Sequence, residues 1–298
     1  MQLSHTNSDS ELNNDNIGKQ LYFGCFSALK RNPYIIGIVL IAMAIFMYGI
    51  MGIYGFSAYP DEFGYWAPAA AMLGKDWSNI TSIGSYYSYG YSVILLPVLF
   101  VFHDSIVAYR VAIVLNLFFQ CVSIVIIYKI LVKLFPYQNR KCLSIAGGIA
   151  VLYPAWIFYT QTTMVEGLLN FLFLTALYLA MMFFEEPGVF RGIAFSIVLI
   201  YLYFVHMRCL GIIGAGIISL LVWIISHRKK GVNFKAFLMI TGILILFGIS
   251  FIIKNGVVEN IYKGTSEYAL SWNDYSGIGY RLSKLFTFDG LIYFLKDF

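Results

Sequence analysis

Long apolar segments separated by short polar ones make up most of the chain. The first runs over residues 34–54, contains no charged residue and follows the basic pair Lys30 and Arg31. A spanning helix needs about 20 apolar residues, so this segment is predicted to cross a membrane. The basic pair predicts that its start is on the cytoplasmic side.

The pattern predicts six more crossings. They are residues 105–128, 142–159 and 163–184, two crossings within 192–226 with their tip at 206–208, and residues 236–253. The segment 192–226 is interpreted as a hairpin because basic residues flank both ends, which requires an even number of crossings. Residues 91–102 are too few for a crossing and predict a short interfacial or re-entrant element. The expected fold class is therefore all-α, with about seven transmembrane helices.

The pattern also divides the chain into three parts. Residues 1–30 are rich in Ser, Asn and Asp and predict a disordered cytosolic tail, not a signal peptide. Residues 31–253 form the predicted transmembrane domain, with an outer loop over 55–104. Residues 254–298 are expected on the extracytoplasmic side, as a short outer segment or as the start of a missing C-terminal part.

Composition supports the membrane class and excludes others. Hydrophobic residues make up 60% of the chain, charged residues 12%, and the mean hydropathy is +0.76. Soluble domains average about 25% charged residues. The basic residues flank apolar segments instead of forming one face, so nucleic acid is not an expected partner, whereas membrane lipids are. The expected location is the plasma membrane, with a cytoplasmic N-terminus.

Two adjacent carboxylates, Asp61 and Glu62, follow the first crossing. Ionisable side chains this close to hydrocarbon are costly, which makes the pair a candidate functional site. A structural interpretation is equally open, because Pro60 suits the first position of a helix and acids in a first turn gain about 0.3–1 kcal/mol from the helix dipole. Residues 63–77 have the spacing of an amphipathic interfacial helix, which Pro68 must kink or split.

The predicted topology brings further ionisable residues to the same membrane face. They are His103, Asp104, Glu166, His206 and Arg208, each at the outer end of an apolar element. An enzyme that takes a sugar from a lipid-linked phosphate needs a base for the acceptor hydroxyl and a cation for the departing phosphate. Asp61 is the candidate base. Arg208 is the candidate phosphate ligand, since guanidinium stays charged and can bind phosphate in a bidentate fork, and His206 could assist it.

Structural interpretations remain beside these roles. An arginine at a hairpin tip commonly snorkels to the headgroups, which applies to Arg208. Glu166 could hold an acceptor hydroxyl or form an ion pair with Arg110 or Arg208. His103 is expected in a turn, with a metal or substrate role as the alternative. Tyr87 belongs to an aromatic group typical of an interfacial belt, with sugar stacking as the alternative.

The acidic pair raises the question of a metal cofactor. Asp61 and Glu62 could hold Mg²⁺ or Mn²⁺, but two neighbours on a helix diverge by about 100°. They are therefore not expected to chelate one ion alone. No metal site is predicted, and a divalent cation remains the alternative.

The order of these features resembles the GT-C glycosyltransferase superfamily, multi-pass enzymes that use polyprenyl-phosphate sugars. The most similar branch contains the protein mannosyltransferases and aminoarabinose transferases (family 39-like). The resemblance rests on the acidic pair after the first crossing, the Tyr/Gly/Pro stretch at 89–97, the sequence Ala108-Tyr109-Arg110, and the acid that ends residues 160–166. It covers roughly residues 34–226.

The resemblance implies that Asp61 acts as or supports the catalytic base, with Glu62 as its partner, and that Arg208 meets the lipid phosphate. The predicted substrate-binding residues are Tyr87, His103, Arg110, Glu166, His206 and Arg208. The implied partners are a polyprenyl-phosphate-sugar donor and an extracytoplasmic glycan, lipid or protein acceptor. A transporter or lipid flippase is the alternative, and it would have ionisable residues near the bilayer midplane and broken helices within the crossings. A non-catalytic membrane scaffold is the third hypothesis.

Overall fold

A computed structural model describes residues 32–55, 60–75, 77, 89–206, 209–226 and 230–261. The regular secondary structure of these residues is helical, and no strand occurs among them. The predicted all-α fold is therefore confirmed. The predicted N-terminal tail and residues 262–298 lie outside the described residues.

Ten helices occur in the described part of the chain. They are α2 (Pro33–Met51), α3 (Pro60–Met72), α4 (Gly90–Val101), α5 (Ser105–Leu134), α6 (Arg140–Val151), α7 (Pro154–Thr160), α8 (Glu166–Glu185), α9 (Val189–Val205), α10 (Leu210–Ser226) and α11 (Lys230–Ile261). Proline begins α2, α3 and α7, at a position where its missing N–H costs nothing. The side chains of Asn32, Asp104 and Asn139 cap α2, α5 and α6 by accepting from backbone amides.

Three of these helices, α2, α5 and α8, are long and apolar enough to cross a membrane. A fourth span results if α6 and α7, which meet at a bend of 60°, form one broken crossing. The shorter apolar helices are α4, α9, α10 and the Phe237–Ser250 part of α11. The chain is therefore a helical membrane protein. The number of about seven crossings stays a prediction, because it requires the shorter apolar helices to span the membrane as well.

The third predicted crossing, residues 142–159, is not one continuous helix. α6 ends at Val151 and α7 begins at Pro154, whose ring cannot continue a helix. Gln120 on α5 compensates for the break, since its side-chain Nε2 donates to the carbonyl of Val151 at 2.7 Å. Pro154 was the sign of this break in the sequence, although the run contains no charged residue.

Other boundaries also differ from the prediction. α3 is not split at Pro68 but continues through it to Met72. The residue four positions earlier, which faces the proline ring, is Gly64, the residue type that adjusts most easily. α5 extends past residue 128 to Leu134, and α11 extends past 236–253 in both directions to Lys230 and Ile261.

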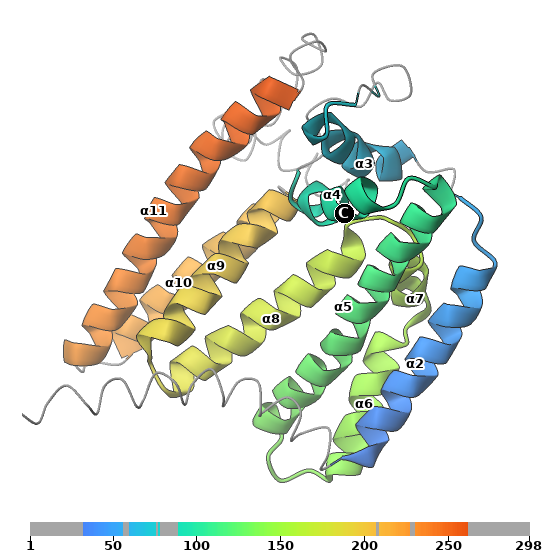
Figure 1. Cartoon of the computed structure of the whole chain (residues 1–298). Helices are drawn as coiled ribbons and strands as arrows, with labels where there is room; N and C mark the ends of the chain where they lie inside the picture. Colours follow the sequence, from blue (N-terminus) through green and yellow to red (C-terminus); the bar gives the residue numbers. More distant parts are fainter. Residues whose placement is uncertain are drawn as a thin grey trace, which may run out of the picture.

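The long helices run side by side, and α3 and α4 lie across one end of them (Figure 1). α8 packs against both α5 and α9, and α11 packs against α9 and α10. One end of the bundle holds α3, α4, the first residues of α5 and α8 and the last residues of α9. We call it the α3 end. Most of the predicted site residues belong to elements that meet there.

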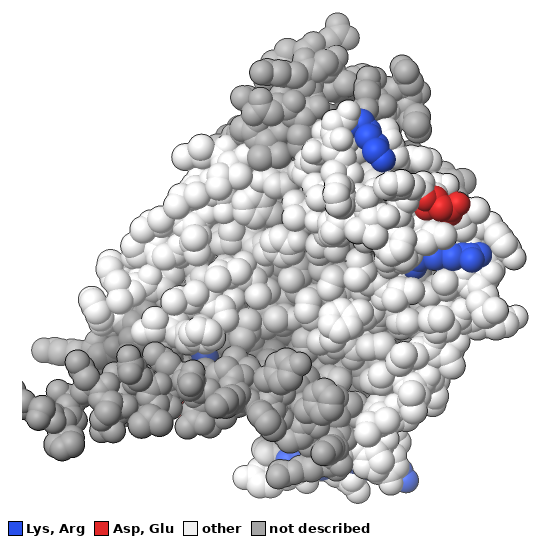
Figure 2. Space-filling model, viewed as in Figure 1, with Lys and Arg blue, Asp and Glu red and all other residues white. Residues whose placement is uncertain are grey.

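The opposite end, which we call the basic end, joins the start of α2 and α6 to the last turns of α5 and α8. Asn32 donates to the hydroxyl of Ser144 at 2.7 Å, and Lys133 forms an ion pair with Glu185. The basic end also carries Arg140, Lys141 and Arg191. Charged side chains visible in Figure 2 lie toward the two ends, and the surface between them is uncharged.

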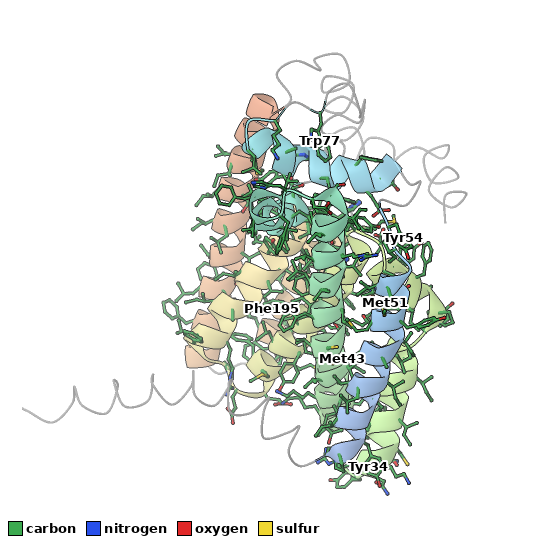
Figure 3. All side chains as sticks on the ribbon, turned by 45° about the vertical axis from the view of Figure 1, so that its right-hand side comes forward. Tyr34, Met43, Met51, Tyr54, Trp77 and Phe195 are labelled. Carbon is green, nitrogen blue, oxygen red and sulfur yellow. The ribbon has the colours of Figure 1, made fainter. Side chains whose placement is uncertain are left out.

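Apolar side chains cover the outside of the bundle as well as its interior. Tyr34, Met43, Met51 and Tyr54, which follow one another along α2 and just beyond it in Figure 3, are between 41% and 74% exposed. In the interior, one large apolar cluster that includes Phe195 joins α3, α4 and α5 to α8–α11, and a smaller one joins α2, α5, α6 and α7. An outer surface this apolar is suited to lipid.

Candidate active site

Local sequence determines where α3 begins and ends. Pro60 starts the helix, and Asp61 and Glu62 lie in its first turn, where carboxylates favour the positive end of the helix dipole. After Met72 the chain turns at Gly74, whose left-handed φ of 72° lets two amides donate back to the last turn, each at 2.9 Å. The helix predicted after the acidic pair is therefore confirmed, but it starts before residue 63 and ends at Met72, short of the predicted end at residue 77.

Glu62 is completely buried, with 0% of the residue exposed. Its Oε2 accepts a hydrogen bond from the hydroxyl of Tyr109 at 2.6 Å. The same oxygen accepts from the backbone amide of Thr163 at 2.8 Å and from the Thr163 hydroxyl at 2.5 Å. Trp66, one turn further along α3, donates its indole N–H to that hydroxyl at 2.9 Å. We call Glu62, Trp66, Tyr109 and Thr163 the Glu62 cluster.

The Glu62 cluster ties α3 to α5 and to the loop before α8. Hydrogen bonds to a charged group contribute about 1.5–3 kcal/mol each, and a buried carboxylate without donors would cost several kcal/mol. Thr163 satisfies the carboxylate twice because it offers both a hydroxyl and an amide. The first turn of α3 is consequently held against the bundle, which restricts the position of the neighbouring Asp61.

The loop between α7 and α8, residues 161–165, belongs to the same framework. Asn116 on α5 donates to the carbonyl of Thr162 at 2.7 Å and accepts from the hydroxyl of Tyr91 on α4 at 2.9 Å. The amide of Thr163 is bonded to Glu62. Buried non-helical backbone requires hydrogen-bond partners from other parts of the protein. Side chains from α3 and α5 provide them here.

Asp61 differs from Glu62 in burial, although the two are adjacent. Successive helical residues point about 100° apart, so when Glu62 faces the bundle, Asp61 lies at its boundary and is partly exposed. A partly exposed carboxylate can meet a substrate hydroxyl, whereas the oxygen of Glu62 is already occupied by three donors. The two acids therefore suit different roles. The sequence analysis proposed Asp61 as the base and Glu62 as its partner, but it did not predict that Glu62 is buried.

Arg110 and Glu166 adjoin the Glu62 cluster. Arg110 follows Tyr109 on α5, and its Nε donates to the carbonyl of Ile53 at 2.8 Å while its guanidinium lies 5.3 Å from the centre of the Tyr54 ring. These contacts fasten α5 to the segment after α2. Glu166 is the first residue of α8, where the helix dipole favours a carboxylate, and it is partly buried.

The two predicted histidines lie at helix boundaries. His103 is exposed between α4 and α5, as expected for a turn, and the adjacent Asp104 caps α5 by accepting from the amide of Val107 at 2.8 Å. His206 ends α9 and is partly buried. Cys209 begins the next segment, and burial raises the pKa of its thiol to about 11. That thiol stays protonated near neutral pH and is unsuited to nucleophilic chemistry.

The structure brings several predicted site residues to one end and leaves others untested. Asp61, Glu62, His103, Arg110, Glu166 and His206 all belong to elements of the α3 end. Tyr87 and Arg208 lie outside the described residues, so their roles stay predictions. Sequence reasoning did not assign site roles to Trp66, Tyr109, Asn116, Thr162 and Thr163. It placed Tyr91 in the aromatic group typical of an interfacial belt, whereas Tyr91 is buried and bonded to Asn116. The sequence did contain a signal for such residues. A polar side chain inside an apolar segment needs a hydrogen-bond partner when it is buried, which predicts a contact with another element.

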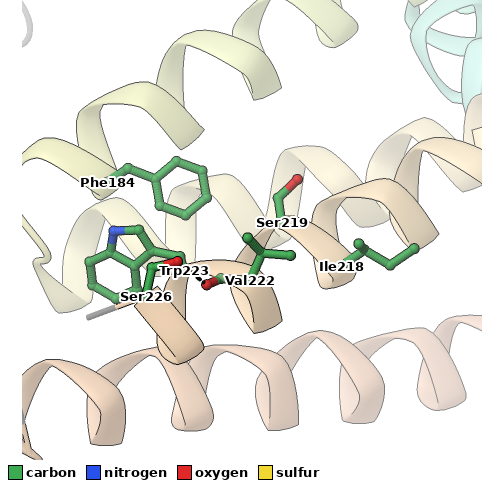
Figure 4. Close-up of a pocket in the computed structure, with 6 residues that line it drawn as sticks. All are labelled: Phe184, Ile218, Ser219, Val222, Trp223 and Ser226. Atoms are coloured by element: carbon green, nitrogen blue, oxygen red, sulfur yellow. Dashed lines mark hydrogen bonds between the residues drawn. The ribbon is translucent and has the colours of Figure 1, made fainter. Parts of the chain in front are cut away.

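Two further features bear on ligands. No group of three or more His, Cys, Asp and Glu side chains that could hold a metal ion occurs in the described ranges. A groove of about 340 Å³ is lined by Phe184, Ile218, Ser219, Val222, Trp223 and Ser226 (Figure 4). It lies between the last turns of α8 and α10, at the basic end, and is therefore separate from Asp61.

A comparison of the chain with protein-family models and with curated proteins finds no match. The fold and the apolar surface define the class to which the chain belongs, that of helical integral membrane proteins. Any more specific function has to be argued from the residues of the α3 end.

Proposed function

We propose that this protein is a membrane glycosyltransferase that moves a sugar from a polyprenyl-phosphate donor to an extracytoplasmic glycan, lipid or protein. The observation that carries the proposal is the division between two adjacent acids. Asp61 is partly exposed at the end of a membrane bundle, while Glu62 is buried and bonded to three donors that fix their common helix. The resemblance of the sequence to GT-C enzymes supports the same function.

In the proposed reaction, the Asp61 carboxylate accepts the proton of the acceptor hydroxyl. The hydroxyl oxygen attacks the anomeric carbon as the bond between that carbon and the phosphate oxygen breaks. A glycosidic bond forms with inversion, and polyprenyl phosphate leaves with the bonding electrons. A positioned base contributes about 10²- to 10⁴-fold to such a step.

The departing phosphate requires a positive group. Arg208 is the proposed phosphate ligand on the evidence of the sequence, because its guanidinium remains charged and can hold phosphate oxygens in pairs. His206 would assist it. The described neighbours of Arg208 in the chain, His206 and Cys209, belong to the α3 end, which supports a shared site with Asp61.

Charge distribution supports an orientation for the site. Lys133, Arg140, Lys141 and Arg191 gather at the basic end, which by the positive-inside rule is the cytoplasmic end. The α3 end would then face the extracytoplasmic side of the plasma membrane. Acceptors there are reached without crossing the bilayer.

A transporter or lipid flippase is the second candidate, and one observation favours it. The 60° bend between α6 and α7 is the kind of broken span that transporters use. At this break the carbonyl of Val151 has no partner within its own helix, and it accepts a hydrogen bond from the neutral side chain of Gln120 at 2.7 Å. The bend is thereby accounted for as structure, and the ionisable residues discussed above lie at the ends of helices.

The proposed function is tested by replacing the gene in its own host with versions encoding Asp61→Asn and Asp104→Asn. Both changes remove one carboxylate at the α3 end, and Asn is as good an N-cap as Asp, so Asp104→Asn is a matched control. We expect Asp61→Asn to abolish one extracytoplasmic glycan, glycolipid or glycoprotein with unchanged protein level in the membrane. Asp104→Asn should leave the profile as in the wild type.

The readout is mass spectrometry of the host's glycans, glycolipids and glycoproteins. If the Asp61→Asn strain has the same profile as the wild type, the glycosyltransferase proposal fails. If an accumulated solute or lipid changes sides of the membrane instead, the transporter hypothesis is favoured.

A further inference from the structure

Tyr89, the residue before α4, carries a buried hydroxyl that has no hydrogen-bond partner in the structure as described. The residue is 8% exposed. A buried hydroxyl left without a partner costs about 1–3 kcal/mol, and such groups are rare enough to need an explanation. A ligand oxygen that arrives during function would provide one.

Packing fixes the Tyr89 ring in place. The ring lies 5.5 Å from that of Phe204 on α9, at an interplanar angle of 59°. The next residue, Gly90, is so close to α9 that an added Cβ would be 2.5 Å from the backbone carbon of Phe204. Tyr201 donates its hydroxyl to the carbonyl of Gly90 at 2.9 Å. The hydroxyl of Tyr89 is therefore held where it is by a rigid contact between α4 and α9.

Three other tyrosines of the α3 end use their hydroxyls for structure. Tyr91 donates to Asn116, Tyr109 to Glu62 and Tyr201 to Gly90. Tyr89 stands apart from these three. Burial also raises its pKa above the ordinary value of tyrosine, so the hydroxyl keeps its proton and remains a donor at neutral pH.

The location of Tyr89 connects it to the proposed reaction. Ser92, one turn into α4, donates to the carbonyl of Tyr65 on α3 at 2.6 Å. Tyr65 lies one turn after Asp61. On its other side Tyr89 packs against the end of α9, where His206 follows. Tyr89 is thus between the helix that carries the proposed base and the end of α9, which His206 follows.

We infer that the Tyr89 hydroxyl donates a hydrogen bond to an oxygen of the bound polyprenyl-phosphate sugar. The inference rests on the proposed function. The oxygen belongs either to the phosphate or to the sugar, and both accept a hydrogen bond from a phenol. Tyr89 is a substrate-binding residue in this assignment, and its contribution is to affinity for the donor.

The test compares Tyr89→Phe with Tyr201→Phe in purified protein. Each change removes one tyrosine hydroxyl at the contact between α4 and α9. Without ligand, Tyr89→Phe should unfold at the wild-type temperature or above it, because it removes an unsatisfied group. Tyr201→Phe should unfold at a lower temperature, because it leaves the Gly90 carbonyl without its donor. A purely structural role for Tyr89 would predict a fall in both.

The ligand arm uses two probes, a short-chain polyprenyl phosphate and the same prenol carrying a phosphate-linked hexose. We expect Tyr89→Phe to weaken binding of the hexose-bearing probe about tenfold, measured by thermal shift and by the KM of transfer, with kcat nearly unchanged. Equal weakening of both probes assigns the contact to the phosphate, and weakening of the hexose-bearing probe alone assigns it to the sugar.

Unchanged affinity for both probes in Tyr89→Phe would overturn the inference. So would a failure of either probe to stabilise the wild-type protein. Because thermal shift needs no turnover, binding that depends on Tyr89 without any transfer would refute the proposed function and leave the binding role of Tyr89 intact.

Discussion

A single carboxylate oxygen, Oε2 of Glu62, connects three parts of the chain. Its donors are Tyr109, 47 residues further along, and Thr163, 101 residues further along. Asp61 is fixed in place by this neighbour while remaining partly exposed. At the scale of residues, the two acids differ because the distant donors bond Glu62, which is buried, and leave Asp61 partly exposed.

Replacing Glu62 by Gln should lower the stability of the protein. The shape is kept but the charge that strengthens three hydrogen bonds is lost, at a cost of about 2 kcal/mol. We expect the unfolding midpoint in detergent to fall by about 4–8 °C. The measurement is thermal unfolding followed by circular dichroism.

A matched pair of threonines provides the control for this prediction. Thr163→Val removes the hydroxyl that bonds Glu62 and Trp66, and keeps the amide bond to Glu62. Thr175→Val removes only a bond within α8, from its hydroxyl to the carbonyl of Phe171 at 2.7 Å. Thr163→Val should therefore destabilise the protein more. Equal midpoints for the two threonine variants, or a wild-type midpoint for Glu62→Gln, would contradict the assigned role of the Glu62 cluster.

The sequence predicted the acidic pair as a candidate site with Asp61 as the base, but it could not predict which of the two acids is buried. A carboxylate at the start of a helix looks the same whether it is buried or exposed, and the deciding partner, Thr163, lies 101 residues away. Tyr109 and Thr163 stand inside the short motifs that carry the family resemblance. Their hydroxyls gave no sign, before the fold was known, that they meet the same oxygen.

At the scale of elements, α4 holds the α3 end together. It is a short helix, as residues 91–102 predicted, and it packs between α3 and α9. The apolar pattern located it because its length excludes an ordinary crossing. Pro154 could have predicted the break between α6 and α7, whereas the compensating group, Gln120, comes from α5 and could not be predicted from the local sequence.

Gly90 should be essential to the contact between α4 and α9. A methyl group at this position would be 2.5–2.6 Å from the backbone of Phe204 and Val205, which cannot move aside like a side chain. Gly90→Ala should therefore destabilise the protein by about 1–3 kcal/mol. Thermal unfolding measures the effect.

Gly37, inside α2, is the matched control because an added Cβ meets nothing within 4 Å. Alanine is the better helix former by about 1 kcal/mol, so Gly37→Ala should be neutral or stabilising. If Gly90→Ala behaves in the same way as Gly37→Ala, the close packing of α4 on α9 is wrong.

At the scale of the whole molecule, the chain has two chemically different ends joined by an apolar body. The α3 end carries the paired acids and the Glu62 cluster, and the basic end carries Lys133, Arg140 and Lys141. The apolar pattern correctly predicted a membrane protein. The flanking charges correctly predicted that the basic residues and the acidic pair lie at different ends of the apolar body. The number of crossings does not follow from the apolar pattern, since helices such as α9 and α10 have only 17 residues each, fewer than the roughly 20 that a span needs.

The proposed orientation predicts which end of α5 is accessible from outside intact cells. In a variant without the four native cysteines, Asp104→Cys should react with a membrane-impermeant maleimide. Tyr137→Cys, in the fully exposed turn after α5, should react only after the cells are permeabilised. The opposite labelling pattern would reverse the orientation and move Asp61 to the cytoplasmic side.

The central claim, that Asp61 is the base of a sugar transfer at the α3 end, is tested most directly with purified protein in lipid nanodiscs. The protein is incubated with a radiolabelled polyprenyl-phosphate hexose or aminopentose and an extract of the host's cell envelope, and released polyprenyl phosphate is measured beside transferred sugar. We predict equal amounts of the two products with wild-type protein and about a 10²- to 10⁴-fold lower rate with Asp61→Asn. Transfer at the wild-type rate by Asp61→Asn would contradict the claim.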